Sequence, residues 1–232
     1  MKLLALDSAT NWLSVACGDG ALWHERGEPS GEQHSERVLP LIAEVLAEAG
    51  WSLTEIDGIA FGAGPGSFTG VRIACGVAQG LAFGVNVPLV PVPTLQAMAQ
   101  AACREDGATH VLVCLDARMR EVYSAAYQRE GSAWHVRREP AVVKPAAVQV
   151  PADAAGSWVG IGNGFAVYPE LHSLVGIGRV VASAAPSARA IGELALPRFA
   201  AGEGVTPASA LPLYVRHRIA LTTAERAAGQ RL

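Results

Sequence analysis

The amino-acid sequence predicts an α/β fold made of two copies of a βββαβα unit, with the second copy reduced. Two apolar strand-like runs each end in an aspartate, Asp7 in the first half of the chain and Asp116 in the second. Each half also carries a Gly-x-Gly pair after a later apolar run, beginning at Gly62 and at Gly162. An element order that recurs along a chain indicates internal duplication, so we expect two related halves.

The first half opens with three expected strands. "KLLALDSAT" and "WLSVACGDG" are apolar runs joined by a short polar turn, and "ALWHERGEP" adds a third antiparallel strand. Apolar residues then recur at helical spacing from Val38 to Ala49, and Gly50 ends this helix. Ser35 is the expected N-cap, although Pro40 leaves the start of the helix open.

A strand "GIAFG", a glycine-rich loop, a second helix through about Gly84 and a strand "PLVPVP" follow. The loop "FGAGPGSFTG" lacks the lysine of a G-x-x-x-x-G-K-[ST] phosphate loop, and its spacing does not match G-x-G-x-x-G. Backbone N–H groups at a helix N-terminus nevertheless attract anions. An anion contact and a purely structural turn are therefore both open for this loop.

The second half repeats the order with weaker patterning. "HVLVCLDARMR", "EVYSAAYQREG" and "AWHVRREPAVV" are expected strands, "WVGIGNGF" contains a fourth, and a helix runs from about Ser187 to Ala200. The segment "KPAAVQVPADAAG", where the middle helix is expected, has poor helical periodicity. We expect residues 1–103 with about 186–232 to form one domain, and residues 104–185 to form a smaller, degenerate second domain.

Composition limits the classes of function. Half of the 232 residues are apolar and 17% are charged, as in a compact globular protein. The net charge of −3 offers no general surface for nucleic acid or an acidic membrane. No apolar run approaches the roughly 20 residues that span a bilayer, and the N-terminus is no signal peptide, so a cytoplasmic location is predicted. The four cysteines are widely spaced without a C-x-x-C pair, which favours free thiols.

The second predicted helix carries glycines every four residues, at Gly76, Gly80 and Gly84. Each costs roughly 1 kcal/mol relative to alanine inside a helix, so three in register indicate that another backbone approaches closely. The neighbour is either the helix at 36–49 of the same chain or a helix of another subunit, and both are open.

The histidines do not indicate a metal site or a hydrolase. The six histidines form no H-x-x-H or H-x-x-x-H pair. His34, Ser35 and Glu36 are consecutive in "QHSER", and neighbours along one helix cannot meet face to face as a catalytic relay must. Helix-start chemistry explains these three residues better.

The duplicated layout resembles the actin, hexokinase and chaperone-ATPase (ASKHA) superfamily, in which the two opening hairpins hold nucleotide phosphates. A likeness of fold alone fixes no function. Asp7 has two open interpretations: an outer-sphere contact to nucleotide-bound Mg²⁺, or a turn residue bonded to the local backbone. The candidate nucleotide or anion contacts are Asp7, Ser8, Thr10, Ser67 and Thr69.

Six motifs together resemble the bacterial TsaB (YeaZ) family over almost the whole chain: "LALDSAT", "HSERVLPLI", "GPGSFTGVRI", "LDARMREVY", "GNG" and "LPLYVR". The resemblance implies the duplicated superfamily fold with a shortened second domain. It also implies a subunit required to form threonylcarbamoyladenosine beside the anticodon of tRNAs that read codons beginning with adenine.

The resemblance further implies a catalytic partner, TsaD, which holds the metal and transfers the threonylcarbamoyl group. In TsaD the stretch matching "VPVPTLQAMA" resembles V-N-H-L-E-G-H, whose two histidines bind the metal, and Thr94 and Met98 stand at those positions here. A hydroxyl and a thioether are poor ligands for a hard or borderline cation. We therefore expect a non-catalytic scaffold subunit without its own metal site.

The family implies a heterodimer with TsaD, or a homodimer when TsaD is absent, built as a four-helix bundle from residues 36–49 and 69–84 of each subunit. The small ATPase TsaE is expected to join, tRNA to be reached only through the complex, and no membrane to be involved. No cofactor is expected to bind this chain tightly, and ATP or ADP with Mg²⁺ is a candidate at the junction. The expected partner-binding residues are Val38, Leu41, Ile42, Val45, Arg72, Gly76, Gly80 and Gly84.

Two other functions are open. A nucleotide-binding ATPase or small-molecule kinase of the same superfamily would use Asp7 and Asp116, although the second half lacks a clear adenosine-pocket loop beyond "GIGNG". A peptidase, a label that relatives have carried, lacks a credible nucleophile–base pair. The basic tail is either a solvated terminus or a tRNA contact; its arginines are Arg216, Arg218, Arg226 and Arg231.

Overall fold

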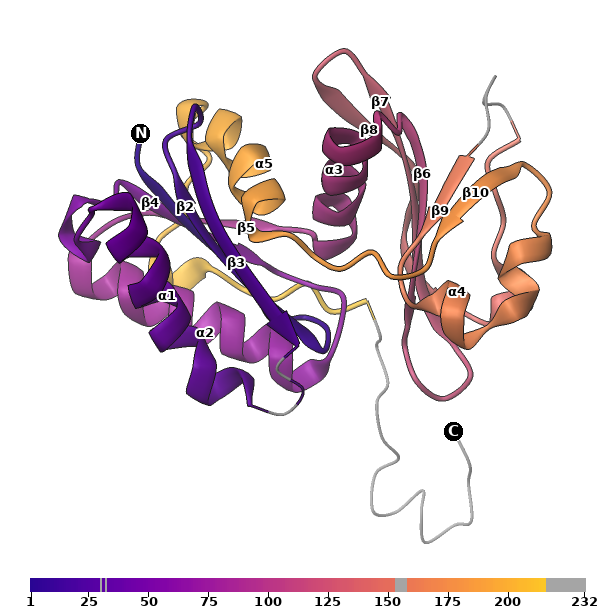
Figure 1. The fold of residues 1–232 in the computed structure, drawn as a ribbon, viewed down its shortest axis with the longest axis horizontal. Coiled ribbons are helices and arrows are strands. Elements are labelled where there is room, and N and C mark those ends of the chain that lie inside the picture. The colour runs from indigo at the N-terminus through magenta and orange to yellow at the C-terminus, as the bar shows by residue number, and fades with distance from the viewer. Residues whose placement is uncertain (30, 32, 153–157, 216–232) are drawn as a thin grey trace, which may run out of the picture.

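The structure is a computed structural model that describes residues 1–29, 31, 33–152 and 158–215. It contains two five-stranded sheets that lie side by side (Figure 1). The first sheet has the order β3-β2-β1-β4-β5 and the second β10-β9-β6-β7-β8, which is the same arrangement read from the other edge. The predicted duplicated α/β fold is confirmed.

The element bounds follow the predicted order. The first sheet contains β1 (Leu3–Asp7), β2 (Trp12–Gly18), β3 (Trp23–Pro29), β4 (Gly58–Gly62) and β5 (Leu89–Val92). The second contains β6 (His110–Asp116), β7 (Val122–Glu130), β8 (Ala133–Val143), β9 (Trp158–Ile161) and β10 (Ile177–Val181). The α-helices are α1 (His34–Ala49), α2 (Phe68–Val85), α3 (Thr94–Asp106), α4 (Gly164–Val167) and α5 (Ala188–Ala200). Short 3₁₀ helices lie at Leu53–Glu55, Pro145–Ala147, Pro169–Ser173 and Pro207–Ser209.

The two halves share strand pairing as well as order. In each sheet an antiparallel three-strand meander is extended by two parallel strands. Asp7 pairs with Ser14 at the end of β1, and Asp116 pairs with Val122 at the end of β6. The two aspartates therefore occupy equivalent positions in the two copies.

The first sheet is covered on both faces, which is why β1 is buried throughout. Side chains alternate along a strand, so Leu4 and Leu6 pack beneath α1 and α2, whereas Leu3 and Ala5 pack beneath α5. α5 follows the second sheet in the chain and returns to the first (Figure 1). α3 lies between the sheets, with Ala97 in the core of the first and Met98 in the core of the second.

Two details differ from the sequence predictions. α1 begins at His34 with Gln33 as its N-cap, so Ser35 lies inside the first turn and caps nothing; Pro40 is exposed within the helix. Between β8 and β9, the described residues contain only the 3₁₀ turn Pro145–Ala147 in place of a full helix. This shortening accounts for the reduced second copy.

Candidate functional site

The outward face of α2 is uncovered within this chain. Gly76, Gly80 and Gly84 are exposed, and a Cβ built on any of them would meet no atom within 4 Å. The helix at 36–49 of the same chain is therefore not the backbone that these glycines admit. Phe83, beside the last glycine, is 80% exposed. No described residue therefore covers this face at the three glycines.

The inward face of α2 packs on the first sheet. Its buried residues are Gly70, Val71, Ala74, Cys75, Ala78 and Ala82. By length and composition α2 could cross a bilayer, although the core helix of a globular protein passes the same test. Because one face of α2 lies on the sheet, we interpret the helix as part of the first lobe, meaning the first sheet with α1, α2 and α5.

The apolar residues of α1 occupy the core instead of the predicted partner surface. Val38, Leu41, Ile42 and Val45 are between 0 and 4% exposed and pack against the first sheet. These side chains were predicted to contact a partner. They are instead buried, because the apolar stripe of the helix packs on the chain's own sheet. The exposed residues of α1 are different ones; the apolar residues among them are Leu39, Pro40, Ala43 and Ala47.

Glycines in the loop before α2 serve close packing against the β1–β2 turn. A Cβ on Gly66 would overlap the Ala9 carbonyl oxygen, and one on Gly70 would overlap the Ser8 carbonyl oxygen. The Ser67 N–H donates to Ala9 O (2.6 Å), and Ser67 Oγ accepts the Gly70 N–H (3.4 Å) as the N-cap of α2. The structural interpretation of this loop accounts for its glycines.

Asp7 is the centre of a buried hydrogen-bond network. Its Oδ1 accepts the Ala9 N–H (2.7 Å) and its Oδ2 accepts the Thr94 hydroxyl (2.8 Å), while Thr94 Oγ1 accepts the Gly64 N–H (3.2 Å). Burial raises the pKa of Asp7 to about 6, although both hydrogen bonds act to lower it. Both carboxylate oxygens are thus used inside the protein, and a Cβ on Gly62 would overlap one of them.

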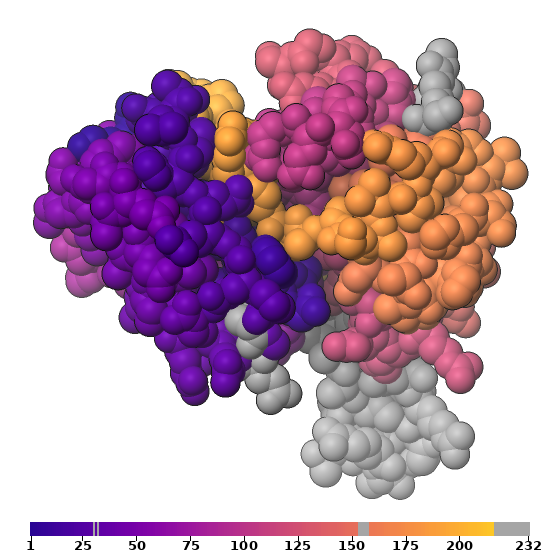
Figure 2. Space-filling model, viewed as in Figure 1, coloured from indigo at the N-terminus to yellow at the C-terminus, as the bar shows by residue number. Residues whose placement is uncertain are grey.

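The other predicted anion contacts divide between the core and a cleft. Ser8 is buried and its hydroxyl donates to Gly70 O (2.8 Å). Thr10, Ser67 and Thr69 line a cleft of about 920 Å³ between the two lobes. Figure 2 shows the lobes as two masses with a hollow between them. Asp7 and Ser8 are not among the residues that line this cleft.

Residues from the second lobe form the opposite wall of the cleft. Asp116 Oδ1 accepts the Tyr168 hydroxyl (3.0 Å) and the Arg118 N–H (2.9 Å), and Asn163 Oδ1 accepts the Asp116 N–H (2.9 Å). Asp116 was predicted as a possible nucleotide or metal contact, whereas no sequence pattern pointed to Arg118, Asn163 or Tyr168. In the structure Asp116 lines the cleft with Arg118 and Asn163.

The turn after β6 is strained. Arg118, Met119 and Arg120 all have positive φ, at 61°, 55° and 58°. Left-handed backbone costs roughly 1–2 kcal/mol for each non-glycine residue, and such strain gathers at functional sites. The sequence "DARMREVY" contains no glycine or asparagine in this turn, so no local signal reveals it.

Thr94 and Met98 lie on the first turns of α3, where they have structural contacts. Thr94 is fully buried in the hydrogen-bond network of Asp7, and Met98 is 1% exposed in the core between α3 and the second sheet. In the part of the chain that the structure describes, no three His, Cys, Asp or Glu side chains gather closely enough to hold a metal ion.

His34 faces the cleft from the start of α1. It is 5% exposed, its Nε2 has no hydrogen-bond partner in the described chain, and burial lowers its pKa. Ser35 and Glu36 are exposed, so the three residues of "HSE" do not converge. The expected basic tail, at Arg216 and beyond, lies outside the described residues.

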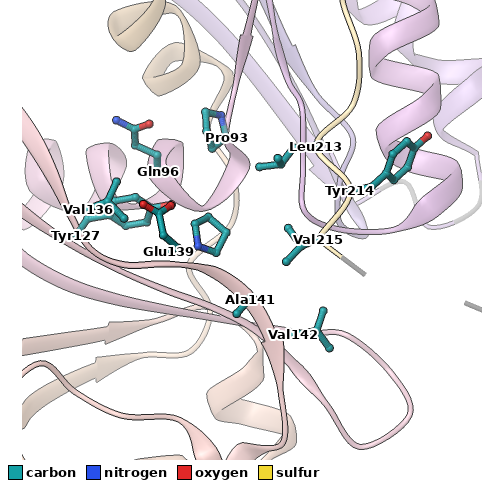
Figure 3. Close-up of a pocket in the computed structure, with 11 residues that line it drawn as sticks. Pro93, Gln96, Tyr127, Val136, Glu139, Ala141, Val142, Leu213, Tyr214 and Val215 are labelled. Carbon is teal, nitrogen blue, oxygen red and sulfur yellow. The ribbon is translucent and has the colours of Figure 1, made fainter. Parts of the chain in front are cut away.

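A second pocket of about 530 Å³ lies between α3, β8 and the C-terminal described residues (Figure 3). Pro93, Val136 and Leu213 line it, and Glu139 is an acidic group at its wall. Tyr214 points away from the other labelled side chains, toward α2. The segment before the tail thus divides this pocket from the cleft.

The chain is similar to proteins of one tRNA-modification system. Residues 28–190 match the family model described as TsaD, tRNA N6-adenosine threonylcarbamoyltransferase. The tRNA threonylcarbamoyladenosine biosynthesis protein TsaB of Escherichia coli K12 is 42% identical over 226 residues, covering 95% of this chain and 96% of the relative. TsaB of Haemophilus influenzae is 47% identical over 130 residues, covering 56% of this chain and 55% of the relative. YeaZ from Pseudomonas aeruginosa superposes with a TM-score of 0.84 at 42% identity, covering 92% of this chain and 99% of that structure.

Proposed function

The chain belongs to the TsaB (YeaZ) family and takes part in tRNA threonylcarbamoyladenosine biosynthesis, and on this premise we propose that it is a non-catalytic subunit that binds the catalytic TsaD subunit. TsaE joins the pair, and tRNA is modified by the assembled complex in the cytoplasm. When TsaD is absent, the same surface forms a homodimer.

One observation carries the proposal: the uncovered glycine face of α2. Three exposed helical glycines cost roughly 1 kcal/mol each relative to alanine, and no contact among the described residues offsets the cost. Close approach of a second helix does offset it, because glycine lets two helix backbones pack without an intervening side chain. Arg72, one turn before Gly76, is exposed, and its guanidinium lies over the Phe68 ring at the N-terminal end of this face.

The absence of a catalytic role is proposed from the chemistry at the start of α3. Thr94 donates to Asp7 and Met98 packs in the core, so neither side chain supplies the imidazole that the catalytic paralogue is expected to use. Asp7 is a poor fit for a Mg²⁺ contact, because it is buried and both of its oxygens accept protein hydrogen bonds. We therefore place any ATP or ADP with Mg²⁺ at the junction with the partner.

Reconstitution tests this proposal. Purified chain, TsaD, TsaE and the adenylate-forming enzyme are mixed with unmodified tRNA, and the modified nucleoside is measured by mass spectrometry. The full mixture modifies tRNA, whereas this chain alone and the mixture without it do not. Modification by the chain alone, or undiminished modification in its absence, contradicts the proposal.

A nucleotide-binding ATPase is the second candidate, and the 920 Å³ cleft at the N-terminus of α2 favours it. Thr10 lines this cleft, unlike Asp7, so Thr10→Val is the appropriate probe variant. Titration calorimetry with ATP and Mg²⁺ decides the matter: micromolar binding lost in Thr10→Val supports the ATPase, and no heat of binding removes it. The separated residues of "HSE" leave a peptidase without a relay.

A further inference from the structure

Two half-exposed aromatic side chains meet at the mouth of the interlobe cleft. Phe68, the first residue of α2, is 49% exposed, and Tyr214 is 46% exposed. Their ring centroids are 6.3 Å apart at an angle of 39°. The Arg72 guanidinium lies 3.1 Å from the Phe68 ring centre and 5.1 Å from that of Tyr214. Two rings and a planar cation thus form one layered surface, the Phe68–Tyr214 platform.

The facing wall of the cleft supplies further cationic groups. Arg118 lies on the left-handed turn with its side chain 89% exposed, and Arg120 is exposed on the same turn. Asp116 is the acid among the described residues that line the cleft, and it already accepts hydrogen bonds from Tyr168 and the Arg118 backbone. Asp116 also forms an ion pair with the Arg118 guanidinium (3.3 Å), so the additional positive charge near the cleft mouth comes from Arg72 and Arg120, which are both exposed.

A buried polar atom of a residue in the cleft wall lacks a partner among the described residues. His34 lines the cleft and is only 5% exposed. Its Nε2 has no hydrogen-bond partner in the described chain. Buried polar atoms are normally satisfied, so an orphan imidazole nitrogen indicates that a ligand or water completes it. Thr69 and Asn163 add further polar groups to the same walls.

We propose that this cleft mouth binds an unpaired segment of RNA, with a base stacked on the Phe68–Tyr214 platform and a phosphate between Arg72 and Arg118. Unstacked bases are recognised by aromatic rings and guanidinium planes, and their phosphates by nearby arginines. The inference rests on the proposed function only for choosing RNA as the ligand. It assigns to this chain a contact of its own beyond the partner-binding surface.

The platform differs from a protein-docking patch in composition. Phe83, at the other end of α2, is 80% exposed and stacks on no ring or cation of the described residues, as expected for a helix-packing contact. Phe68 instead has a stacked guanidinium, a second ring and a facing basic turn. This contrast favours a flat, anionic, π-rich ligand at the Phe68 end.

Fluorescence anisotropy with the full chain and a labelled single-stranded RNA of alternating cytidine and adenosine tests the inference. Phe68→Ala and Tyr214→Ala should each weaken binding roughly 5- to 150-fold, the range expected for one lost stacking contact. Tyr214→Phe keeps the ring and should bind within about twofold of the original. Arg118→Gln should reduce the salt-dependence slope of binding by about 0.7.

Phe83→Ala is the matched control, since it removes an equally large exposed ring from the same helix. It should leave RNA binding unchanged, while co-purification with TsaD reports separately on the proposed subunit interface. The inference is overturned if the unaltered chain does not bind the RNA, or if Phe83→Ala weakens binding as much as Phe68→Ala. It is also overturned if Phe68→Ala disrupts only the association with TsaD.

Discussion

Two sets of glycines within one stretch of chain have opposite surroundings. At Gly62, Gly66 and Gly70 an added Cβ would overlap Asp7 or the backbone of the β1–β2 turn. At Gly76, Gly80 and Gly84 it would meet nothing within 4 Å. The first set is explained entirely by the chain's own packing. The second set contacts nothing in the part of the chain that the structure describes, and this is the physical basis for proposing that it receives a partner.

The largest expected effect comes from breaking the inner set. In Gly70→Val the new side chain collides with the Ser8 backbone, which cannot move aside as a flexible side chain can. We expect the free energy of unfolding to fall by at least about 3 kcal/mol, the upper range for overpacking. Urea denaturation measures this change, and a loss below about 1 kcal/mol would show that the loop is not closely packed.

The buried carboxyl group of Asp7, which lies against the inner glycine Gly62, should make the stability of the fold depend on pH. Its folded-state pKa of about 6 lies above the ordinary value of 3.8, so its contribution to stability is complete below pH 4 and is lost as pH rises through 6. Two pKa units correspond to on the order of 3 kcal/mol. We expect the stability of Asp7→Asn, relative to the original chain, to increase by up to that amount between pH 4 and 7. A constant difference across this range would contradict the buried carboxylate.

The smallest effect lies on the outer face. Gly80→Ala adds a methyl group where there is open space and removes the helix cost of glycine, so the isolated chain should gain about 0.5–1 kcal/mol. Thermal denaturation at a concentration that keeps the chain monomeric measures it. A loss of stability would show that Gly80 is tightly packed like the inner glycines, and would contradict the difference between the two sets.

The sequence predicted the fold from the recurrence of apolar strand, aspartate and hairpin, and both sheets follow that order. It did not identify the outward face of α1, because helical apolar periodicity marks the face that covers the chain's own sheet, as Val38 and Val45 do. The environment of Asp7 was likewise beyond local patterns, since it depends on Thr94, 87 residues away.

The features of the cleft depend on long-range assembly for the same reason. Phe68 and Tyr214 are far apart in the sequence, and hydrogen bonds such as that from the Leu213 N–H to Ala63 O hold the C-terminal segment beside the loop before α2. The left-handed turn at Arg118 contains no glycine, so the local sequence does not predict it. By contrast, the four-residue spacing of Gly76, Gly80 and Gly84 was visible in the sequence, and the structure added that the face is open.

The most direct test of the account is sedimentation velocity on Gly80→Leu, alone and mixed with TsaD, with circular dichroism on the same samples. Leucine fits the open space in the monomer but blocks close approach of a second helix. The account predicts an unchanged dichroism spectrum and at least a tenfold weaker association with TsaD, equivalent to about 1.4 kcal/mol. Undiminished association of a folded Gly80→Leu chain would contradict the claim that the outer glycines receive a partner helix.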